Sequence, residues 1–334
     1  MGAAAAVLPP LPEVLAGARV VALPMVTRFR GITVREAVLF EGPNGWTEFS
    51  PFVEYGDDEA SAWLAAAYDF GWGPAPARLR SSIPVNATVP AVPAAAVPGV
   101  LARFPGARTA KVKVADPGQT LADDVARVEA VRAALGPEGR VRVDANALWN
   151  LDEAEHAIRA LEPFDLEYVE QPVATVPELA ELRRRVSRLG ILIAADESVR
   201  KAADPLAVAR AGAADVLVVK AQPLGGVRAA LDIVAQAGLP CVVSSAIDTS
   251  VGLAMGAALA AALPSLEFDC GLGTAALLER DVTDAPLLPA GGAIPVARPS
   301  VSGALLEANA AAPERREWWL ARIARCHEVL ASRS

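Results

Sequence analysis

Five apolar runs between residues 110 and 220 each end in charged residues: Ala110-Lys111-Val112-Lys113-Val114, Val141-Arg142-Val143-Asp144-Ala145-Asn146, Tyr168-Val169-Glu170-Gln171-Pro172, Ile193-Ala194-Ala195-Asp196-Glu197-Ser198 and Leu217-Val218-Val219-Lys220. From Lys113 the charged ends follow at intervals of 31 (144−113), 26 (170−144), 26 (196−170) and 24 (220−196) residues. Each interval has room for one strand, one helix and two turns. The stretch therefore predicts parallel strands joined by crossover helices.

Such a repeat, continued around a circle, closes into a (β/α) barrel, a fold whose active groups lie at the C-terminal ends of the strands. The five charged ends should therefore share one mouth. They are Lys113, Asp144, Glu170, Asp196 and Lys220. Strand alternation also places Lys111 and Lys113 on one face.

The rest of the chain divides into two flanking parts. Residues 1–82 contain strand patterns at 19–23, 34–40 and 46–49 and a helix pattern at 60–68, which predict a small α+β domain. We assign the barrel to residues 83–285, with a first strand at 83–89 and an eighth at 266–270. Residues 286–334 begin with an irregular proline-rich stretch and end in a helix from about Glu314.

One barrel helix can be placed closely from local signals. Thr120 can cap a helix whose apolar positions follow in steps of three and four until Gly136 ends it. A long apolar run at residues 251–263 is too short to cross a bilayer, so we expect a buried helix there.

Composition limits the classes of partner. The chain has 334 residues, 53% of them hydrophobic, and a net charge of −8. Because phosphate binding needs clustered Lys and Arg, this charge argues against nucleic acid. Residues 1–6 lack the basic start of a signal peptide, and no membrane span is expected, so we predict a cytoplasmic location. A monomer is the simplest expectation.

Several reactive residue types are expected to be bystanders. Arg183, Arg184 and Arg185 form the one basic cluster, which fits the solvated face of a barrel helix. The three cysteines are far apart and lack metal-ligand spacing, which favours buried thiols. His156 and His327 fall in predicted helices and not at the strand ends. This placement argues against a Ser-His-Asp mechanism.

The acids Asp144, Glu170 and Asp196 have the chemistry of a hard-cation site. Three carboxylates that converge in one mouth repel one another unless they are protonated or neutralised. Oxygen ligands of this kind prefer Mg²⁺, which Mn²⁺ can replace, over zinc. Any one of these acids alone would more often be a strand-end cap or a surface ion pair. Their succession on three strands predicts a metal site.

The lysines at both ends of the acid series are candidate proton-transfer groups. Lys113 and Lys220 could approach a bound substrate from opposite sides. Because the positive charge of a metal and of Lys111 disfavours a further ammonium, the pKa of Lys113 should fall towards that of a useful base.

This set of residues resembles the muconate lactonizing subgroup of the enolase superfamily, and the likeness covers nearly the whole chain. The matching motifs are Lys111-x-Lys113, Asp144-x-Asn146, Glu170-Gln171-Pro172, Asp196-Glu197-Ser198 and Lys220. The resemblance implies an α/β fold, a modified TIM barrel (β/α)7β, covered by an α+β capping domain built from both ends of the chain. It also implies that the three acids bind Mg²⁺ and that the two lysines exchange protons with the carbon alpha to a carboxylate.

Within that subgroup, three further segments resemble the actinobacterial dehydratases of menaquinone biosynthesis: Arg28 to Glu36, Gly45 to Phe52 and Ser244 to Ser250. The resemblance implies a lyase that carries out the syn-dehydration of 2-succinyl-6-hydroxy-2,4-cyclohexadiene-1-carboxylate, a small anionic substrate. Asp248 departs from the pattern, which has Glu there. We assign Lys111, Asn146, Arg28, Ser244 and Ser245 to support or to substrate binding.

Other functions stay open at this point. An N-succinylamino acid racemase or a dipeptide epimerase would use the same metal and both lysines as alternating acid and base. A Schiff-base aldolase could use Lys220 as a nucleophile but would not need three converging acids. A non-catalytic binding protein fits the charged strand ends least well.

Overall fold

The computed structural model describes residues 8–201 and 204–333. The prediction that concerned residues 1–6 lies outside the described residues. Within the described part of the chain, every helix is too short or too polar to span a bilayer.

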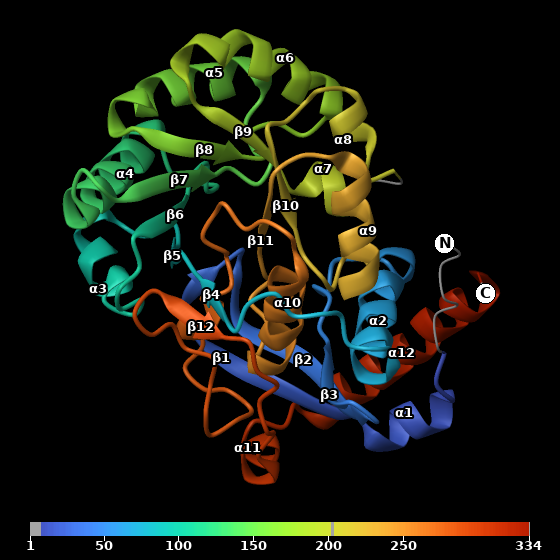
Figure 1. Ribbon diagram of the computed structural model, residues 1–334. Helices are drawn as coiled ribbons and strands as arrows, with labels where there is room; N and C mark the ends of the chain where they lie inside the picture. Colours follow the sequence, from blue (N-terminus) through green and yellow to red (C-terminus); the bar gives the residue numbers. More distant parts are fainter. Residues whose placement is uncertain (1–7, 202–203, 334) are drawn as a thin grey trace.

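A curved sheet of seven parallel strands forms the centre of the larger part of the molecule (Figure 1). From β5 to β11 each strand pairs with the next one along the chain. These strands are β5 (Ala87–Val89), β6 (Thr109–Lys113), β7 (Arg140–Asp144), β8 (Leu166–Glu170), β9 (Leu192–Ala195), β10 (Val216–Val219) and β11 (Cys241–Val243). The predicted barrel is confirmed, because neighbouring strands with crossover helices run in one direction around it.

The barrel closes through a segment that is not a regular strand. Isolated bridges join Ser244 to Gly271 and Val85 to Cys270, between β11 and β5. The predicted strand at 266–270 is therefore wrong. One reason is that Arg142 Nη1 donates to the carbonyl oxygen of Asp269 at 2.6 Å, which takes this backbone group out of a ladder.

The predicted first strand at 83–89 is also divided in two. β4 (Ser82–Pro84) pairs antiparallel with β12 (Ala293–Pro295), and only β5 joins the barrel. The two-stranded sheet thus attaches the start of the C-terminal segment to the beginning of the barrel region.

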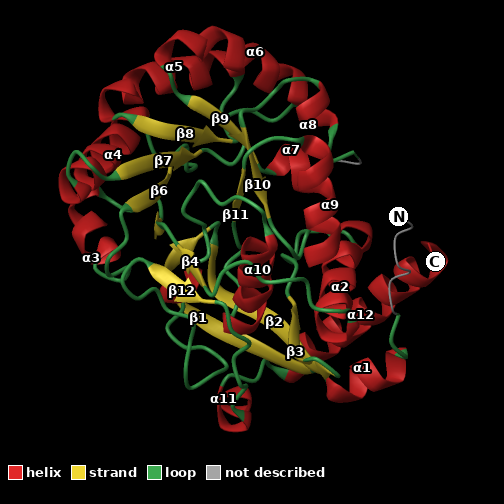
Figure 2. Cartoon of the chain, in the orientation of Figure 1, coloured by secondary structure: helices red, strands yellow, loops and turns green. Residues whose placement is uncertain are grey.

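The helices of this part of the chain lie mostly outside the barrel sheet (Figure 2). They are α3 (Val97–Leu101), α4 (Leu121–Leu135), α5 (Leu151–Leu161), α6 (Val176–Val186), α7 (Glu197–Arg200), α8 (Ala207–Arg210), α9 (Val227–Ala237) and α10 (Ser250–Ala262), with short 3₁₀ turns at Ala94–Ala96, Glu162–Phe164, Ser187–Leu189 and Thr274–Leu277. The helix predicted after Thr120 is confirmed: Thr120 and Asp123 form a reciprocal capping box, and Gly136 ends the helix with a φ of 73°. The run at 251–263 forms α10, which is buried along its length.

The N-terminal part is an antiparallel sheet of three strands, β1 (Arg19–Phe29), β2 (Ile32–Gly42) and β3 (Gly45–Phe49). Helix α2 (Asp57–Trp72) follows it, and the short helix α1 (Leu11–Gly17), which was not predicted, precedes it. The predicted strands lie within longer ones, because the β1–β2 register continues to a tight turn.

The C-terminal segment returns to this sheet. After α11 (Gly303–Ala308), the amide of Ala311 donates to the carbonyl oxygen of Val20 at 2.9 Å. Helix α12 (Pro313–Arg333) then lies beside α2, as Figure 1 shows. Both ends of the chain therefore build one layer against the barrel, which is the capping arrangement expected from the resemblance.

The turn between β1 and β2 positions the capping sheet over the barrel mouth. Arg30 and Gly31 form the turn with φ values of 49° and 81°, and Phe29 pairs with Ile32. Positive φ at both central residues is typical of a two-residue hairpin turn. The Phe29 ring centroid lies 5.3 Å from Lys113 Nζ, so the hairpin tip contacts the barrel's charged residues.

The residues expected to be bystanders lie outside the barrel mouth. Cys241, Cys270 and Cys326 are buried free thiols. His327 Nδ1 lies 3.0 Å from the hydroxyl of Tyr68, and His156 lies on α5. The arginines of α6 form surface ion pairs, among them Arg183 with Asp215 at 2.6 Å.

Candidate active site

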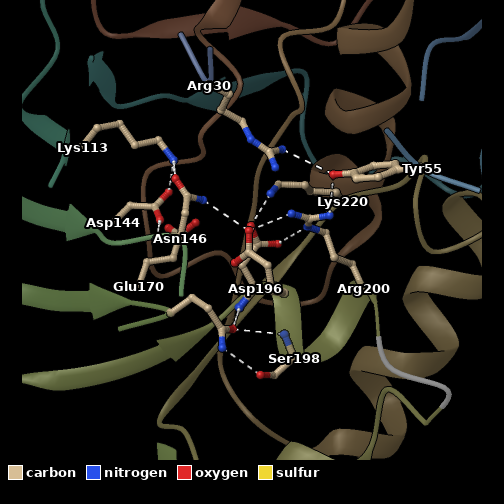
Figure 3. A network of polar contacts seen from close by, with 12 residues as sticks. Arg30, Tyr55, Lys113, Asp144, Asn146, Glu170, Asp196, Ser198, Arg200 and Lys220 are labelled. Atoms are coloured by element: carbon tan, nitrogen blue, oxygen red, sulfur yellow. Dashed lines mark hydrogen bonds and ion pairs between the residues drawn. The ribbon is translucent and has the colours of Figure 1, made fainter. Parts of the chain in front are cut away.

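Five charged side chains meet at one end of the barrel because their strands are in register. Lys113 is the Cα partner of Asp144, and Asp144 is the Cα partner of Glu170. Asp196 follows β9 directly, and Lys220 follows β10. Figure 3 shows these residues facing one another across the mouth.

The carboxylates and ammonium groups are in direct contact. Lys113 Nζ lies 2.5 Å from Asp144 Oδ2, and Lys111 Nζ lies 2.9 Å from Glu170 Oε1 and 3.2 Å from Asp144 Oδ2. Lys220 forms an ion pair with Asp196. Asp144, Glu170 and Asp196 are at most 1% exposed. Each buried acid therefore has a cationic partner within the chain.

These contacts divide the acids electrostatically. Burial disfavours the charged form of all three, but Lys113 and Lys111 hold the pKa of Asp144 below its ordinary value, and Lys220 and Arg200 do so for Asp196. Glu170 behaves oppositely: burial and the neighbouring charge of Asp144 raise its pKa to about 7. The central acid thus carries most of the repulsion.

The two lysines of β6 also differ. Burial lowers the pKa of Lys113, and the adjacent Lys111 lowers it further, although Asp144 opposes both. For Lys111, the attraction of Glu170 and Asp144 outweighs burial and raises the pKa well above its ordinary value. Lys111 is therefore a fixed cation, whereas Lys113 releases a proton more readily.

Asn146 lies in the first turn after β7 and holds Lys113. Its backbone has a φ of 47°, its Oδ1 accepts a hydrogen bond from Lys113 Nζ at 2.5 Å, and its Nδ2 donates to Glu197 Oε1 at 3.2 Å. The side chain therefore links the Lys113 ammonium to the loop that carries Asp196.

Gln171 fixes the backbone around Asp196. Its Oε1 accepts from the amides of Asp196 and Ser198 at 3.0 and 3.1 Å, and its Nε2 donates to Ser198 Oγ at 2.7 Å. The Glu-Gln-Pro and Asp-Glu-Ser motifs are thus joined by one amide side chain.

Two residues that sequence reasoning missed complete the Asp196 side. Arg200 Nε donates to Asp196 Oδ1 at 3.0 Å, and its Nη1 donates to the hydroxyl of Tyr55 at 3.1 Å. Arg30 Nη1 lies 3.4 Å from the same hydroxyl (Figure 3). Arg200 could have been found from the sequence, because it lies four residues after Asp196, one helical turn away. No pattern in the sequence points to Tyr55.

The wall opposite the acids comes from β11 and from the capping part. A small cavity of about 30 Å³ is bounded by the three lysines, by Asp144 and Asn146, and by Ser244, Ser245, Ala246, Ile247, Phe29, Arg30 and Phe52, among others. Ser245 Oγ donates to the carbonyl oxygen of Gly271 at 2.7 Å. Ser244 and Ser245 thus lie where the sequence analysis expected substrate-binding residues.

A larger outer cavity adjoins this one. It has a volume of about 690 Å³, and Phe29, Arg30, Lys113 and Asn146 line both spaces. Arg28 lines only the outer cavity. Strand alternation does not put Arg28 and Arg30 on one face, because Arg30 lies in the hairpin turn.

No group of three or more His, Cys, Asp or Glu side chains among the described residues is spaced as a ready-made metal site. The donor set nevertheless has the chemistry of one, since it holds three carboxylates in one place, where burial and the charge of Asp144 raise the pKa of Glu170. Glu197 Oε2, beside them in sequence, is buried and has no hydrogen-bond partner among the described residues. These observations fit a cation that would share the carboxylates with the lysines.

Comparison with known proteins places the chain among related sequences. Residues 91–310 match the family "Enolase C-terminal domain-like", and residues 20–71 match "Enolase N-terminal domain-like". The chain is 58% identical to the o-succinylbenzoate synthase of Mycobacterium ulcerans (strain Agy99), over 97% of both chains. It is 57% identical to the o-succinylbenzoate synthase of Mycobacterium tuberculosis (strain ATCC 25618 / H37Rv), over 97% of this chain and 98% of the relative.

Among solved structures, the muconate lactonizing enzyme from Pseudomonas fluorescens has a similar fold. The TM-score is 0.76 at 20% sequence identity, and the match covers 88% of this chain and 98% of the other. The barrel and its capping layer therefore have the same arrangement as in that enzyme.

Proposed function

The chain belongs to the enolase superfamily and, within it, to the group of o-succinylbenzoate synthases, and from its site we propose that it dehydrates 2-succinyl-6-hydroxy-2,4-cyclohexadiene-1-carboxylate to o-succinylbenzoate. The observation that carries the proposal is the placement of Lys113 and Lys220. Three strands that end in acids separate their two strands, so the lysines reach the cavity from opposite sides.

Lys113 acts as the base in this proposal. Its lowered pKa lets the neutral amine take the proton from the carbon alpha to the substrate carboxylate. The bond between that carbon and hydrogen breaks, and the electron pair passes into the carboxylate. Asn146 orients the amine through its 2.5 Å contact.

The same ammonium then completes the reaction. Lys113 returns the proton to the departing hydroxyl on the same face of the ring, the carbon–oxygen bond breaks, and water leaves. Lys220, which forms an ion pair with Asp196, stabilises negative charge from the other face. Formation of the aromatic ring drives the step.

Asp144, Glu170 and Asp196 would hold Mg²⁺, which members of the enolase superfamily generally bind, and Mn²⁺ could replace it. When bound, this cation would supply positive charge that stabilises the charge developing on the substrate carboxylate. Arg200 and Gln171 keep Asp196 in place for that role.

One further activity has support in the same geometry. Racemisation of N-succinylamino acids, or epimerisation of dipeptides, needs a base on each side of the alpha carbon, and Lys113 and Lys220 have that arrangement. We rank it second because the curated relatives at 57–58% identity are named for the dehydration.

The remaining expectations concern the setting of the enzyme. The substrate is a small anionic molecule. The net charge of −8 argues against a nucleic-acid partner, because nucleic acid is itself negatively charged. We propose a cytoplasmic monomer and keep the domain limits 1–82, 83–285 and 286–334.

The test is a turnover assay with the purified chain. We expect Mg²⁺-dependent conversion of the cyclohexadiene substrate to the aromatic product, with kcat/KM at least about tenfold above that for N-succinylamino acids. Excess EDTA should abolish conversion, and Mg²⁺ or Mn²⁺ should restore it. Racemisation without dehydration would favour the second activity, and full activity in EDTA would contradict the metal.

A further inference from the structure

A carboxylate of the capping sheet reaches the N-terminus of a barrel helix. Glu48 on β3 is fully buried, and its Oε2 accepts hydrogen bonds from the amides of Thr249 and Gly252, both at 3.1 Å, and from Thr249 Oγ1 at 2.5 Å. Thr249 is the N-cap of α10. Glu48 therefore satisfies amides that a helix leaves without partners, and it does so from another part of the fold.

The approach of Glu48 depends on a residue without a side chain. A Cβ atom at Gly252 would lie 2.8 Å from Glu48 Cδ and 2.8 Å from Asp248 Cβ. Such a contact is too close for any side chain, so Gly252 leaves the space that the carboxylate fills.

The segment just before α10 is held from the capping sheet as well. Arg35 Nε on β2 donates to the carbonyl oxygen of Ile247 at 3.1 Å, and its Nη2 donates to the carbonyl oxygen of Ser50. Ser50 Oγ donates to Glu48 Oε1 at 2.5 Å. Arg35 and Glu48 thus bind the backbone on both sides of Asp248.

This loop has a backbone that needs support. Ile247 has a φ of 61°, a conformation that β-branched side chains rarely adopt. Residues in such conformations persist only where the surroundings fix them, and they gather at functional sites. Ser244, Ser245, Ala246 and Ile247 all line the small cavity, so the conformation of the loop sets one wall of the site.

Two buried acids, Glu48 and Asp248, lie close together at this contact. Burial and the nearby Asp248 raise the pKa of Glu48 to about 7, and Arg35 is the buried cation beside both acids. Asp248 Oδ1 and Gln222 Oε1 are buried without hydrogen-bond partners among the described residues. A helix cap alone would not need this cluster, which indicates a positional role.

We propose that Glu48 is a positioning residue that fixes the cavity wall formed by the loop from Ser244 to Asp248, which we call the wall loop, through the N-terminus of α10. The capping sheet and the wall of the reaction site then behave as one unit. The kinetic part of the test rests on the function proposed above.

Glu48→Gln is the first test. The amide is neutral and keeps only one acceptor oxygen, so either Ser50 Oγ or the donors of Thr249 and Gly252 lose their acceptor, the remaining hydrogen bonds lose their charge assistance, and the wall loop loosens. We expect kcat/KM to fall about 10- to 100-fold, with Mg²⁺ affinity within twofold of wild type. A folded Glu48→Gln with wild-type kcat/KM would overturn the proposal.

Asp281→Asn is the matched control. Asp281 accepts hydrogen bonds from Ser250 N and Ser250 Oγ at the same helix end and from Val282 N, and none of its hydrogen bonds within the described residues comes from the wall loop. We expect Asp281→Asn to lower Tm by about as much as Glu48→Gln does, but to change kcat/KM less than twofold. An equal loss of kcat/KM in both variants would assign the effect to the helix end in general and would refute the role of Glu48.

Thr249→Val serves if Glu48→Gln does not fold. It removes the hydroxyl that donates to Glu48 and keeps the shape of the side chain, so kcat/KM should fall about threefold or more. Unchanged kinetics in a folded Thr249→Val would contradict the proposal.

Hydrogen–deuterium exchange of the peptide over residues 244–252 gives a readout that needs no substrate. The amides of this peptide should exchange at least about fivefold faster in Glu48→Gln, or in Thr249→Val, than in the wild-type protein. Equal exchange rates would count against the proposal. If the wild-type chain fails to dehydrate its substrate, the proposed function fails, while this exchange measurement still decides the role of Glu48.

Discussion

Arg28 stands out among the residues near the site because its guanidinium group has no hydrogen bond or ion pair within the described residues. It is exposed, and it lines the outer cavity of about 690 Å³. Arg30, two positions on, is already engaged with the hydroxyl of Tyr55 and lies 4.5 Å from the centroid of the Phe52 ring. A second carboxylate on a succinyl substrate would therefore find an available cation in Arg28.

Arg28→Met should weaken kcat/KM for the succinyl substrate by about 10- to 100-fold, because a charge-assisted contact contributes roughly 1.5 to 3 kcal/mol. Mg²⁺ affinity should not change. Steady-state kinetics measure the effect, with Arg19→Met, an exposed arginine at the other end of the same strand, as the control. If both variants keep wild-type kinetics, Arg28 is an ordinary solvated side chain.

Among single residues, those at the strand ends could be predicted from the sequence. The residues that hold the site in place from the capping part could not. Lys113, Asp144 and Glu170 share a register that a periodic pattern reveals. Tyr55 and Glu48 act on residues far away in sequence, Arg200 and Thr249. No local pattern specifies such contacts, because they depend on how the capping sheet packs on the barrel.

Contacts between strand β2 and helix α12 stabilise the capping part. Glu36 on β2 accepts hydrogen bonds from Arg315 Nη2 at 2.5 Å and from Trp319 Nε1 at 3.0 Å, both on α12. Burial opposes its charge, but these donors outweigh burial and hold the pKa of Glu36 below its ordinary value of 4.5. The pair ties the N-terminal sheet to the C-terminal helix.

Glu36→Gln should lower the free energy of unfolding at pH 7 by about 1 kcal/mol, a modest value because the pair is partly exposed to solvent. Since the folded pKa lies below the unfolded one, this stabilisation is present above pH 4.5 and disappears as the pH falls through the folded pKa. Urea unfolding at several pH values measures it, with Glu317→Gln on the exposed face of α12 as the control. A loss that is the same at low pH would contradict the ionic origin.

Element boundaries show which signals in the sequence are strong. Helix α4 was predicted closely because Thr120 and Gly136 mark its ends with specific side-chain and backbone chemistry. The eighth barrel position failed because its apolar residues suggested a strand, whereas Arg142 and Thr109 bind the backbone and side chain of Asp269 instead. Buried polar contacts of this kind override strand propensity.

For the whole molecule, the central claim is that one barrel mouth brings a base and an opposing cation to a single substrate carbon. Lys113 and Lys220 are separated by 107 positions (220−113), and only closure of the barrel makes them neighbours of one cavity. The repeat predicted this meeting, because strand ends in a parallel barrel share one face. The conformation of the capping layer, whose residues Phe29 and Arg30 line both cavities, has no comparable repeat.

The most direct measurement compares dehydration and alpha-hydrogen exchange in deuterated water for Lys113→Ala and Lys220→Ala, after both variants have been shown to be folded. Lys113→Ala should lose dehydration by at least about 10³-fold and should show no exchange, because the base is gone. Lys220→Ala should also be severely impaired, through the loss of charge stabilisation. A Lys113→Ala variant that dehydrates its substrate near the wild-type rate would contradict the account.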